Sequence, residues 1–199
     1  MAQSILYHEG NRALQDIFDS RRIADRLEEV TTRAALSESD RSFIERMAYF
    51  FLATADAEGR PDVSFKGGSP GFARVTGPSE IAFPDYDGNG MFKSLGNLSV
   101  NENVGLLFVD FERPRRLRVN GTARISRDDP LMNETVGAQM IVRVEARAIF
   151  PNCPRYIPTM ALVEPSIYAP RPGKAPVEPA WKSFAEFADA VHPRQKTAT

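Results

Sequence analysis

Three stretches of the sequence hold side chains that could do chemistry, and the first lies around Lys66. Ser64 and Lys66 come at the end of an alternating stretch and are followed by Gly67-Gly68. A hydroxyl, a cation and two glycines in this order let a backbone approach a ligand closely. A lysine at the end of a strand is, however, usually a solvated edge residue. The stretch is therefore a candidate binding element that needs support from its surroundings.

The second stretch, Asp85-Tyr-Asp-Gly-Asn-Gly90, matches the first six positions of an EF-hand calcium loop. The twelfth position, where such a loop needs a bidentate glutamate, is Gly96, and Lys93 puts a positive charge at a liganding position. We therefore expect no metal site and interpret the segment as a turn that leads into a helix. The backbone amides at the start of that helix, with Asn89 and Lys93, are predicted to form an anion site.

The third stretch, Arg113-Pro-Arg-Arg-Leu-Arg118, is basic. It is short, has no interleaved aromatic residues and leads into a strand in which alternate arginines would face solvent, so it does not predict nucleic-acid binding. Farther along, Cys153 lies between two prolines and near arginines. Such a cysteine is usually an unreactive thiol, and a reactive role is the alternative.

Histidine chemistry is not expected, because the two histidines, His8 and His192, lie near the ends of the sequence. A Ser-His-Asp or Cys-His hydrolase, or a two-histidine metal site, would need one of them to reach the core. The catalytic residues are therefore unknown from the sequence.

The composition indicates one globular domain, with or without an appended arm. The 199 residues are 42% hydrophobic, and a fold of this size buries roughly 70% of the surface of its unfolded chain. A net charge of −1 argues against a nonspecific nucleic-acid binder, and no apolar run approaches the ~20 residues that span a bilayer. The single cysteine excludes an internal disulfide. We expect a cytoplasmic protein without nucleic-acid or membrane partners.

The elements that must position these residues are mainly strands. Apolar spacing predicts one amphipathic helix over residues 11–30 and a second that begins at Ser37 or Ser39. Residues 49–66 are typical of a β-hairpin. Further strands are predicted over residues 72–76, 80–84, 104–111, 116–126 and 140–150, with a short helix over residues 91–100.

Seven strand candidates joined mostly by turns predict a mainly β fold, an antiparallel barrel or sandwich with peripheral helices. Nine of the 15 prolines lie between Pro151 and Pro193, which predicts an extended arm with a short helix near Trp181. We divide the chain into an N-terminal helical segment, a core and a Pro-rich C-terminal arm, at residues 1–36, 37–157 and 158–199.

The order and spacing of several segments resemble the pyridoxamine 5′-phosphate oxidase-like family of FMN-binding split-barrel proteins. The resemblance covers roughly residues 37–157 and implies an antiparallel split β-barrel, a homodimer and two FMN molecules at the subunit interface. The segments that carry it are Ile44–Thr54, Asp56–Ser64 with Lys66-Gly67, Asp87–Asn89, Ser94–Leu98, Val104–Phe108, Leu117–Ala123 and Val144–Tyr156.

Transferred by position, the resemblance implies a set of cofactor-binding residues. Deazaflavin or haem in place of FMN are alternatives within this fold. The C-terminal residues 158–199 do not carry the arginine-rich signature of the true pyridoxamine phosphate oxidases, which argues against pyridoxine chemistry. The implied residues are Val63, Ser64, Phe65 and Lys66 along the isoalloxazine edge and ribityl chain, Asn89, Lys93 and Asn97 at the phosphate, and, more weakly, Arg118 and Asn120.

A bound FMN would carry hydride or electron transfer while the protein orients its ring, and a positive group near the ring, such as Lys66, would raise its reduction potential. The first hypothesis is therefore an FMN-dependent oxidoreductase acting on a small molecule. The second is a non-catalytic flavin-binding carrier, sensor or stress protein. The third is a barrel that has lost flavin and serves as a dimeric interaction module. The sequence identifies neither the substrate nor the electron donor.

Overall fold

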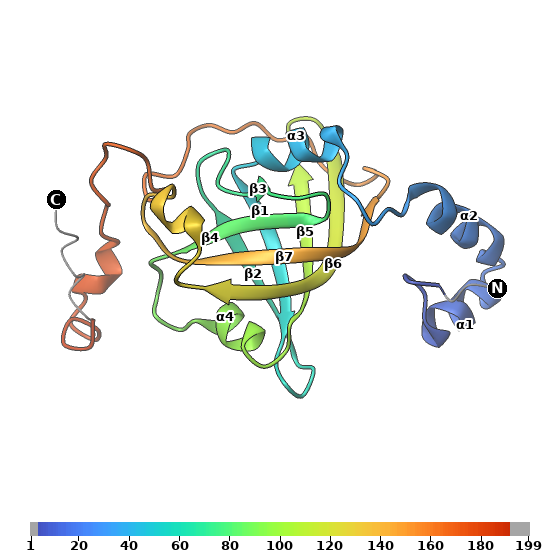
Figure 1. The fold of residues 1–199 in the computed structure, drawn as a ribbon, viewed down its shortest axis with the longest axis horizontal. Helices are drawn as coiled ribbons and strands as arrows, with labels where there is room; N and C mark the ends of the chain where they lie inside the picture. Colours follow the sequence, from blue (N-terminus) through green and yellow to red (C-terminus); the bar gives the residue numbers. More distant parts are fainter. Residues whose placement is uncertain (1–3, 192–199) are drawn as a thin grey trace.

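The structure is a computed structural model that describes residues 4–191. Seven strands form one antiparallel sheet, and helices lie at its periphery (Figure 1). The strands are β1 (Tyr49–Ala55), β2 (Pro61–Gly67), β3 (Arg74–Val75), β4 (Glu80–Tyr86), β5 (Asn103–Asp110), β6 (Arg115–Ser126) and β7 (Ala138–Pro151). The helices are α1 (Glu9–Ile17), α2 (Arg21–Thr31), α3 (Glu38–Arg46) and α4 (Lys93–Leu98), with 3₁₀ turns η1 (Pro130–Asn133) and η2 (Ala180–Ser183).

The predicted fold class, a mainly β antiparallel split barrel with peripheral helices, is confirmed. The strand order is β2-β1-β5-β6-β7-β4-β3, so β2 and β3 are the two edges of the curled sheet. No strand pairing among the described residues joins β2 to β4, and α4 packs instead against β1, β2 and β6. We call the opening between β2 and the segment Pro84–Leu95 the seam. The seam is where the barrel is split.

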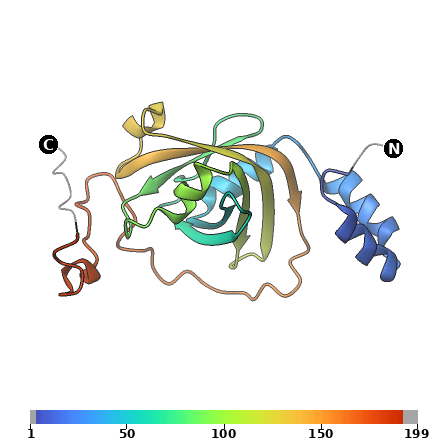
Figure 2. The ribbon, with the colours of Figure 1, turned by 90° about the horizontal axis from the view of Figure 1, so that it is seen from below.

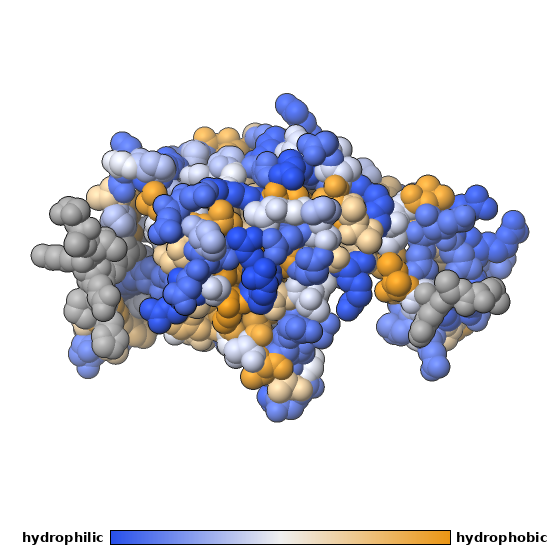
Figure 3. All heavy atoms as spheres, viewed as in Figure 1, coloured by the Kyte–Doolittle hydropathy of each residue, from blue (hydrophilic) through white to orange (hydrophobic). Residues whose placement is uncertain are grey.

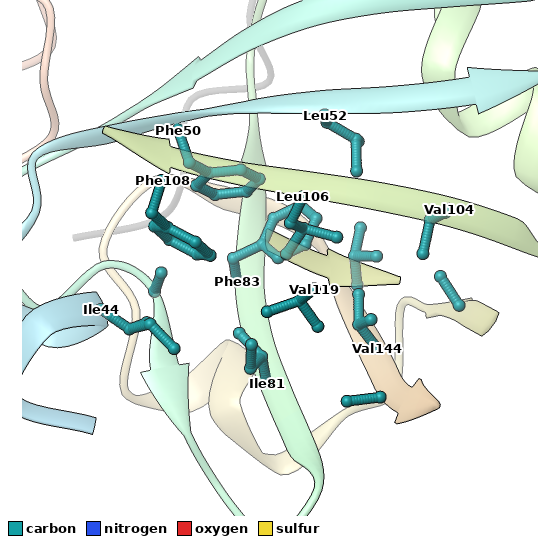
Figure 4. Close-up of a cluster of buried hydrophobic side chains, with 14 of the residues drawn as sticks. Ile44, Phe50, Leu52, Ile81, Phe83, Val104, Leu106, Phe108, Val119 and Val144 are labelled. Atoms are coloured by element: carbon teal, nitrogen blue, oxygen red, sulfur yellow. The ribbon is translucent and has the colours of Figure 1, made fainter. Parts of the chain in front are cut away.

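The barrel is filled by alternating apolar side chains from its strands (Figure 4). The ring of Phe50 meets Phe83 edge-on, with centroids 4.9 Å apart, and lies 5.0 Å from the ring of Phe108. All three side chains are almost completely buried. Strand β7 bulges at Arg147, opposite Asn120 and Gly121 of β6. A Cβ added at Gly121 would lie 2.0 Å from the Glu145 carbonyl oxygen, so only glycine fits there. The core therefore consists of apolar packing and contributes no chemistry.

The single helix predicted over residues 11–30 is wrong, because the chain forms two helices, α1 and α2. They are separated at Asp19, which adopts a left-handed φ of 47°. Aspartate tolerates this conformation and competes with the helix for backbone hydrogen bonds. The pair projects from the barrel, and apolar and charged residues lie side by side on its surface (Figures 1 and 3). Its apolar side chains Leu14, Ile17, Phe18, Ile23 and Leu27 are exposed.

Other boundaries follow the sequence with local differences. Helix α3 has Ser37 as its N-cap in a capping box with Asp40, which decides between the two predicted starts. The strand predicted over residues 72–76 shrinks to the two residues of β3, because Phe72 turns into the core before it. The helix predicted over residues 91–100 shrinks to α4, because Phe92 adopts a φ of 48° just before it.

After β7 the chain runs as an extended arm along the outside of the barrel to its opposite end (Figure 2). The helix predicted near Trp181 is only the 3₁₀ turn η2. His192 and the rest of the predicted arm lie outside the described residues. Within residues 4–191, no helix has the length and apolar character needed to cross a membrane.

Candidate functional site

A cavity of about 860 Å³ opens at the seam. This volume lies toward the upper end of the roughly 300–1,000 Å³ usual for small-molecule sites. Its walls come from two parts of the chain that are far apart in the sequence. They are Ser64–Gly67 of β2, Pro84–Leu95 between the end of β4 and α4, Gln139 of β7, and Trp181, Lys182, Phe187, Ala190 and Val191 of the arm.

An ion pair bridges the seam. Lys66 Nζ lies 3.5 Å from Asp85 Oδ1, and both side chains are largely buried. Burial raises the pKa of Asp85 above its usual range, and the nearby Lys66 ammonium offsets this only in part. A lysine ammonium has three donors, and this long contact uses one of them. Lys66 therefore keeps donors for a ligand in the cavity.

Helix α4 is held against the barrel by two side-chain hydrogen bonds. The Ser94 hydroxyl donates to the Ser64 hydroxyl at 3.0 Å, which joins α4 to β2 at the cavity wall. Farther along the helix, Asn97 Nδ2 donates to Thr54 Oγ1 at 3.0 Å inside the core. These bonds fix the floor of the cavity on a rigid element.

The loop before α4 is shaped by turn chemistry. The Asn89 side-chain oxygen accepts a hydrogen bond from the Met91 amide at 3.0 Å, and Gly90 has a φ of 76° that suits glycine. Lys93 follows on the exposed side, and it forms no ion pair within residues 4–191. Lys93 is therefore a cation at the mouth of the cavity that an anionic ligand can use.

Five of the eight predicted cofactor residues line this cavity, and three do not. Asn97 lies in the core, bonded to Thr54. Val63 and Arg118 belong to the outer face of the sheet, where Val63 pairs with Ala53 and Arg118 with Leu107. The weaker candidate Asn120 pairs with Gly105 on the same face. The five that meet in the cavity are Ser64, Phe65, Lys66, Asn89 and Lys93.

Sequence reasoning missed two groups of residues. Asp85 stood in the calcium-like segment, but no local signal showed that its carboxylate would face Lys66. The sequence predicts only a short helix near Trp181 and gives Phe187 no role, because the place of both residues in the cavity depends on where the arm ends. Long-range placement of this kind has no counterpart in local periodicity.

The donor set fits a flavin mononucleotide. An isoalloxazine ring needs apolar faces and a few polar contacts at its edge, and a phosphate needs cations and amide or hydroxyl donors. The exposed apolar side chains of Met91 and Phe92 supply the first requirement, and Lys66 and Lys93 supply charge. No histidine lines the cavity within the part of the chain that the structure describes.

Comparisons with known proteins agree with this architecture. A family model described as pyridoxamine 5′-phosphate oxidase matches residues 36–164, more than half of the chain. A search of curated proteins found no match.

Several solved structures are similar to this chain. HupZ of Group A Streptococcus is 18% identical, with 63% of this chain and 99% of that chain covered and a TM-score of 0.48. An FMN-binding protein from Syntrophomonas wolfei is 14% identical, with 70% and 97% covered and a TM-score of 0.46. HutZ, the haem storage protein from Vibrio cholerae, is 20% identical, with 59% and 95% covered and a TM-score of 0.43.

Proposed function

Because the chain belongs to the pyridoxamine 5′-phosphate oxidase family, we propose that it binds FMN at the seam and acts as an oxidoreductase on a small organic molecule. The observation that carries the proposal is the seam cavity, which brings together three lysines, hydroxyl and amide side chains, and exposed apolar rings. These are the groups that a phosphorylated planar cofactor requires.

Four residues that line the cavity have a role in this proposal. Ser64 and Lys66 lie along β2 and would contact the ring and ribityl chain, whereas Asn89 and Lys93 would meet the phosphate. Bound FMN would supply hydride or electron transfer, and the protein would orient its ring and exclude water.

We further propose that the protein is a homodimer that pairs through the outer face of β1 and β2. Val63 and Phe65 are 66% and 63% exposed there, and Tyr49 stacks on Phe65 with ring centroids 5.5 Å apart. Exposed apolar groups of this kind mark interaction surfaces. A second copy on this face would also give Val63 and Arg118 a route to a flavin, since neither reaches the cavity of its own chain.

The test is an absorption spectrum of the purified protein before and after denaturation, with mass spectrometry of any released compound. We expect a flavin spectrum and the mass of FMN, and light scattering should give twice the mass of the chain. A deazaflavin or haem spectrum would show that the protein binds that cofactor instead of FMN. A colourless protein that also fails to bind added FMN or deazaflavin would leave the interaction-module hypothesis.

Reoxidation kinetics separate the enzyme from the carrier. Under the proposal, the reduced protein transfers electrons to an organic acceptor at enzymatic rates of about 1 s⁻¹ or more. If no quinone, flavin or nicotinamide partner is turned over by the flavin-loaded protein, the non-catalytic alternative holds. Because the chain has a single cysteine and hence no internal disulfide, the cytoplasm is the proposed compartment.

A further inference from the structure

The C-terminal arm is attached to the barrel at several points along its described course. The Met160 amide donates to the Phe111 carbonyl at 2.9 Å, which holds the arm at one end of the barrel. At the other end, Pro170 packs so closely on Gly137 that an added Cβ would lie 3.0 Å from the proline ring. The arm carries six prolines from Pro158 to Pro179, which limit its conformations before it folds. Its final segment is therefore delivered to a defined place.

That final segment, residues 180–191, which we call the wall segment, is attached beside the cavity by Lys182. The Lys182 ammonium lies 2.6 Å from Asp87 Oδ2 in the loop before α4 and 3.4 Å from Glu178 Oε2. Its side chain is only 13% exposed. A lysine buried and paired in this way is a fixed contact rather than a solvated surface group.

The wall segment faces the cavity with aromatic side chains. The rings of Trp181 and Phe187 meet edge-on, with centroids 5.9 Å apart and an interplanar angle of 83°. Both residues line the cavity, as does Val191. Exposed apolar side chains also line the cavity from the loop before α4, namely Met91 and Phe92. The cavity thus has apolar groups on two walls, with its lysines and carboxylates between them.

We propose that the wall segment is the substrate-selecting wall of the site and that Trp181 specifies a planar aromatic substrate. The inference rests on the proposed FMN site: the cofactor takes the side built by β2 and α4, and the substrate ring lies between it and Trp181. Aromatic rings favour stacked or edge-on contact with other rings beyond what their buried area alone provides. A planar aromatic substrate would make such ring contacts on both faces, with the flavin on one side and Trp181 on the other. A saturated ring of the same size would make neither.

The test uses the full-length protein loaded with FMN and two neutral probes of one carbon skeleton, naphthalene-2-carboxamide and its fully saturated decahydro analogue. Their binding is followed in every variant by the change in flavin absorption. In the original protein and in the variant that keeps Trp181, the one tryptophan of the sequence, its fluorescence is a second signal. The variants are Trp181→Ala, Trp181→Phe and, as a matched control, Phe184→Ala. Phe184 is an exposed aromatic residue next to η2 that does not line the cavity.

We expect the planar probe to bind the original protein about tenfold more tightly than the saturated probe. Trp181→Ala should remove this preference, while Trp181→Phe and Phe184→Ala should keep it. FMN uptake, measured first on each variant, should stay the same. Equal affinity of the original protein for the two probes, or an unchanged preference in Trp181→Ala, overturns the inference while the FMN site stands. Failure of the original protein to take up FMN overturns the proposed function itself.

Discussion

The two ends of strand β4 each carry a carboxylate in an ion pair, and they differ in how completely the protein satisfies it. At the first end, Glu80 accepts from Arg143 at 2.6 Å, from Arg124 at 3.0 Å and from the Thr76 hydroxyl at 2.7 Å. Arg143 also binds Asp129 at 2.5 Å. At the other end, Asp85 has the Lys66 contact of 3.5 Å.

The pKa values differ in the same sense. Burial pushes the pKa of Glu80 upward, but the hydrogen bonds from Thr76 and Arg143 outweigh it and the pKa is lowered. Burial also raises the pKa of Asp85, and there the Lys66 ammonium does not outweigh it. A charge left under-satisfied is costly to the fold, and such groups cluster at functional sites. One end of β4 therefore stabilises the barrel, whereas the other retains binding capacity for a ligand.

The largest expected effect comes from a substitution at the Glu80 end of β4, where the carboxylates are fully paired. Arg143→Met should lower the free energy of unfolding by about 3 kcal/mol, because it leaves the nearly buried Asp129 carboxylate without its partner. Urea unfolding measures this. Arg124→Met is the matched control: it removes a partner of the same Glu80, but its side chain is 66% exposed, so we expect a change within about 1 kcal/mol. Equal losses of unfolding free energy in Arg143→Met and Arg124→Met would contradict the claim that the buried pairing of Arg143 stabilises this end of β4.

The next largest effect is expected at the Asp85 end of β4, where Lys66 is the partner. Lys66→Met should weaken FMN binding by about tenfold, since a hydrogen bond from a charged group contributes roughly 1.5–3 kcal/mol. It should also lower the midpoint potential of the bound FMN, because a positive charge near the ring favours the reduced form. Equilibrium titration and redox titration measure the two quantities. Lys174→Met, which changes an exposed lysine of the arm, serves as the control and should leave both unchanged.

A smaller effect tests whether α4 acts as a rigid floor. Gly96 is an exposed helical residue, and an added Cβ would meet no atom within 4 Å. Gly96→Ala should therefore raise the free energy of unfolding by about 0.5–1 kcal/mol, through helix propensity alone. FMN affinity should not change. A loss of stability would mean that α4 is strained or must move.

The smallest effect is a pair of opposite pH dependences. The lowered pKa of Glu80 gives stability that is present above its usual value of 4.5 and is lost as the pH falls through the folded-state pKa. The raised pKa of Asp85 does the reverse: its contribution is present below the usual 3.8 and is lost as the pH rises through the folded-state pKa.

Unfolding across an acidic pH series isolates each group by comparison with Glu80→Gln and Asp85→Asn. On acidification, the stability of the original protein should fall relative to Glu80→Gln and rise relative to Asp85→Asn. If the stability differences from Glu80→Gln and from Asp85→Asn changed with pH in the same direction, the proposed difference between the two ends of β4 would be wrong.

The elements that local patterns specify were predictable. The β1–β2 hairpin, the alternation in β6 and β7 and the Ser37 cap follow from periodicity and capping. Ser64 and Lys66 share one face because they are two residues apart on one strand. Short irregular segments were not predictable, because the left-handed residues Asp19 and Phe92 shorten helices without any glycine to announce it.

The rest of the site depends on tertiary placement. Asp85 reaches Lys66 because the sheet curls until β2 faces the end of β4, and Lys182 reaches Asp87 because the arm follows the barrel. Neither pair is local in sequence. The seam itself is a gap in strand pairing, and no pattern within a single strand encodes it.

The most direct test of the central claim is a crystal structure of the protein grown with FMN. The account predicts density for the isoalloxazine ring in the seam cavity, with Lys66 and Ser64 along its edge and Lys93 at the phosphate. Density for FMN elsewhere on the protein, or an empty seam at saturating FMN, would contradict it.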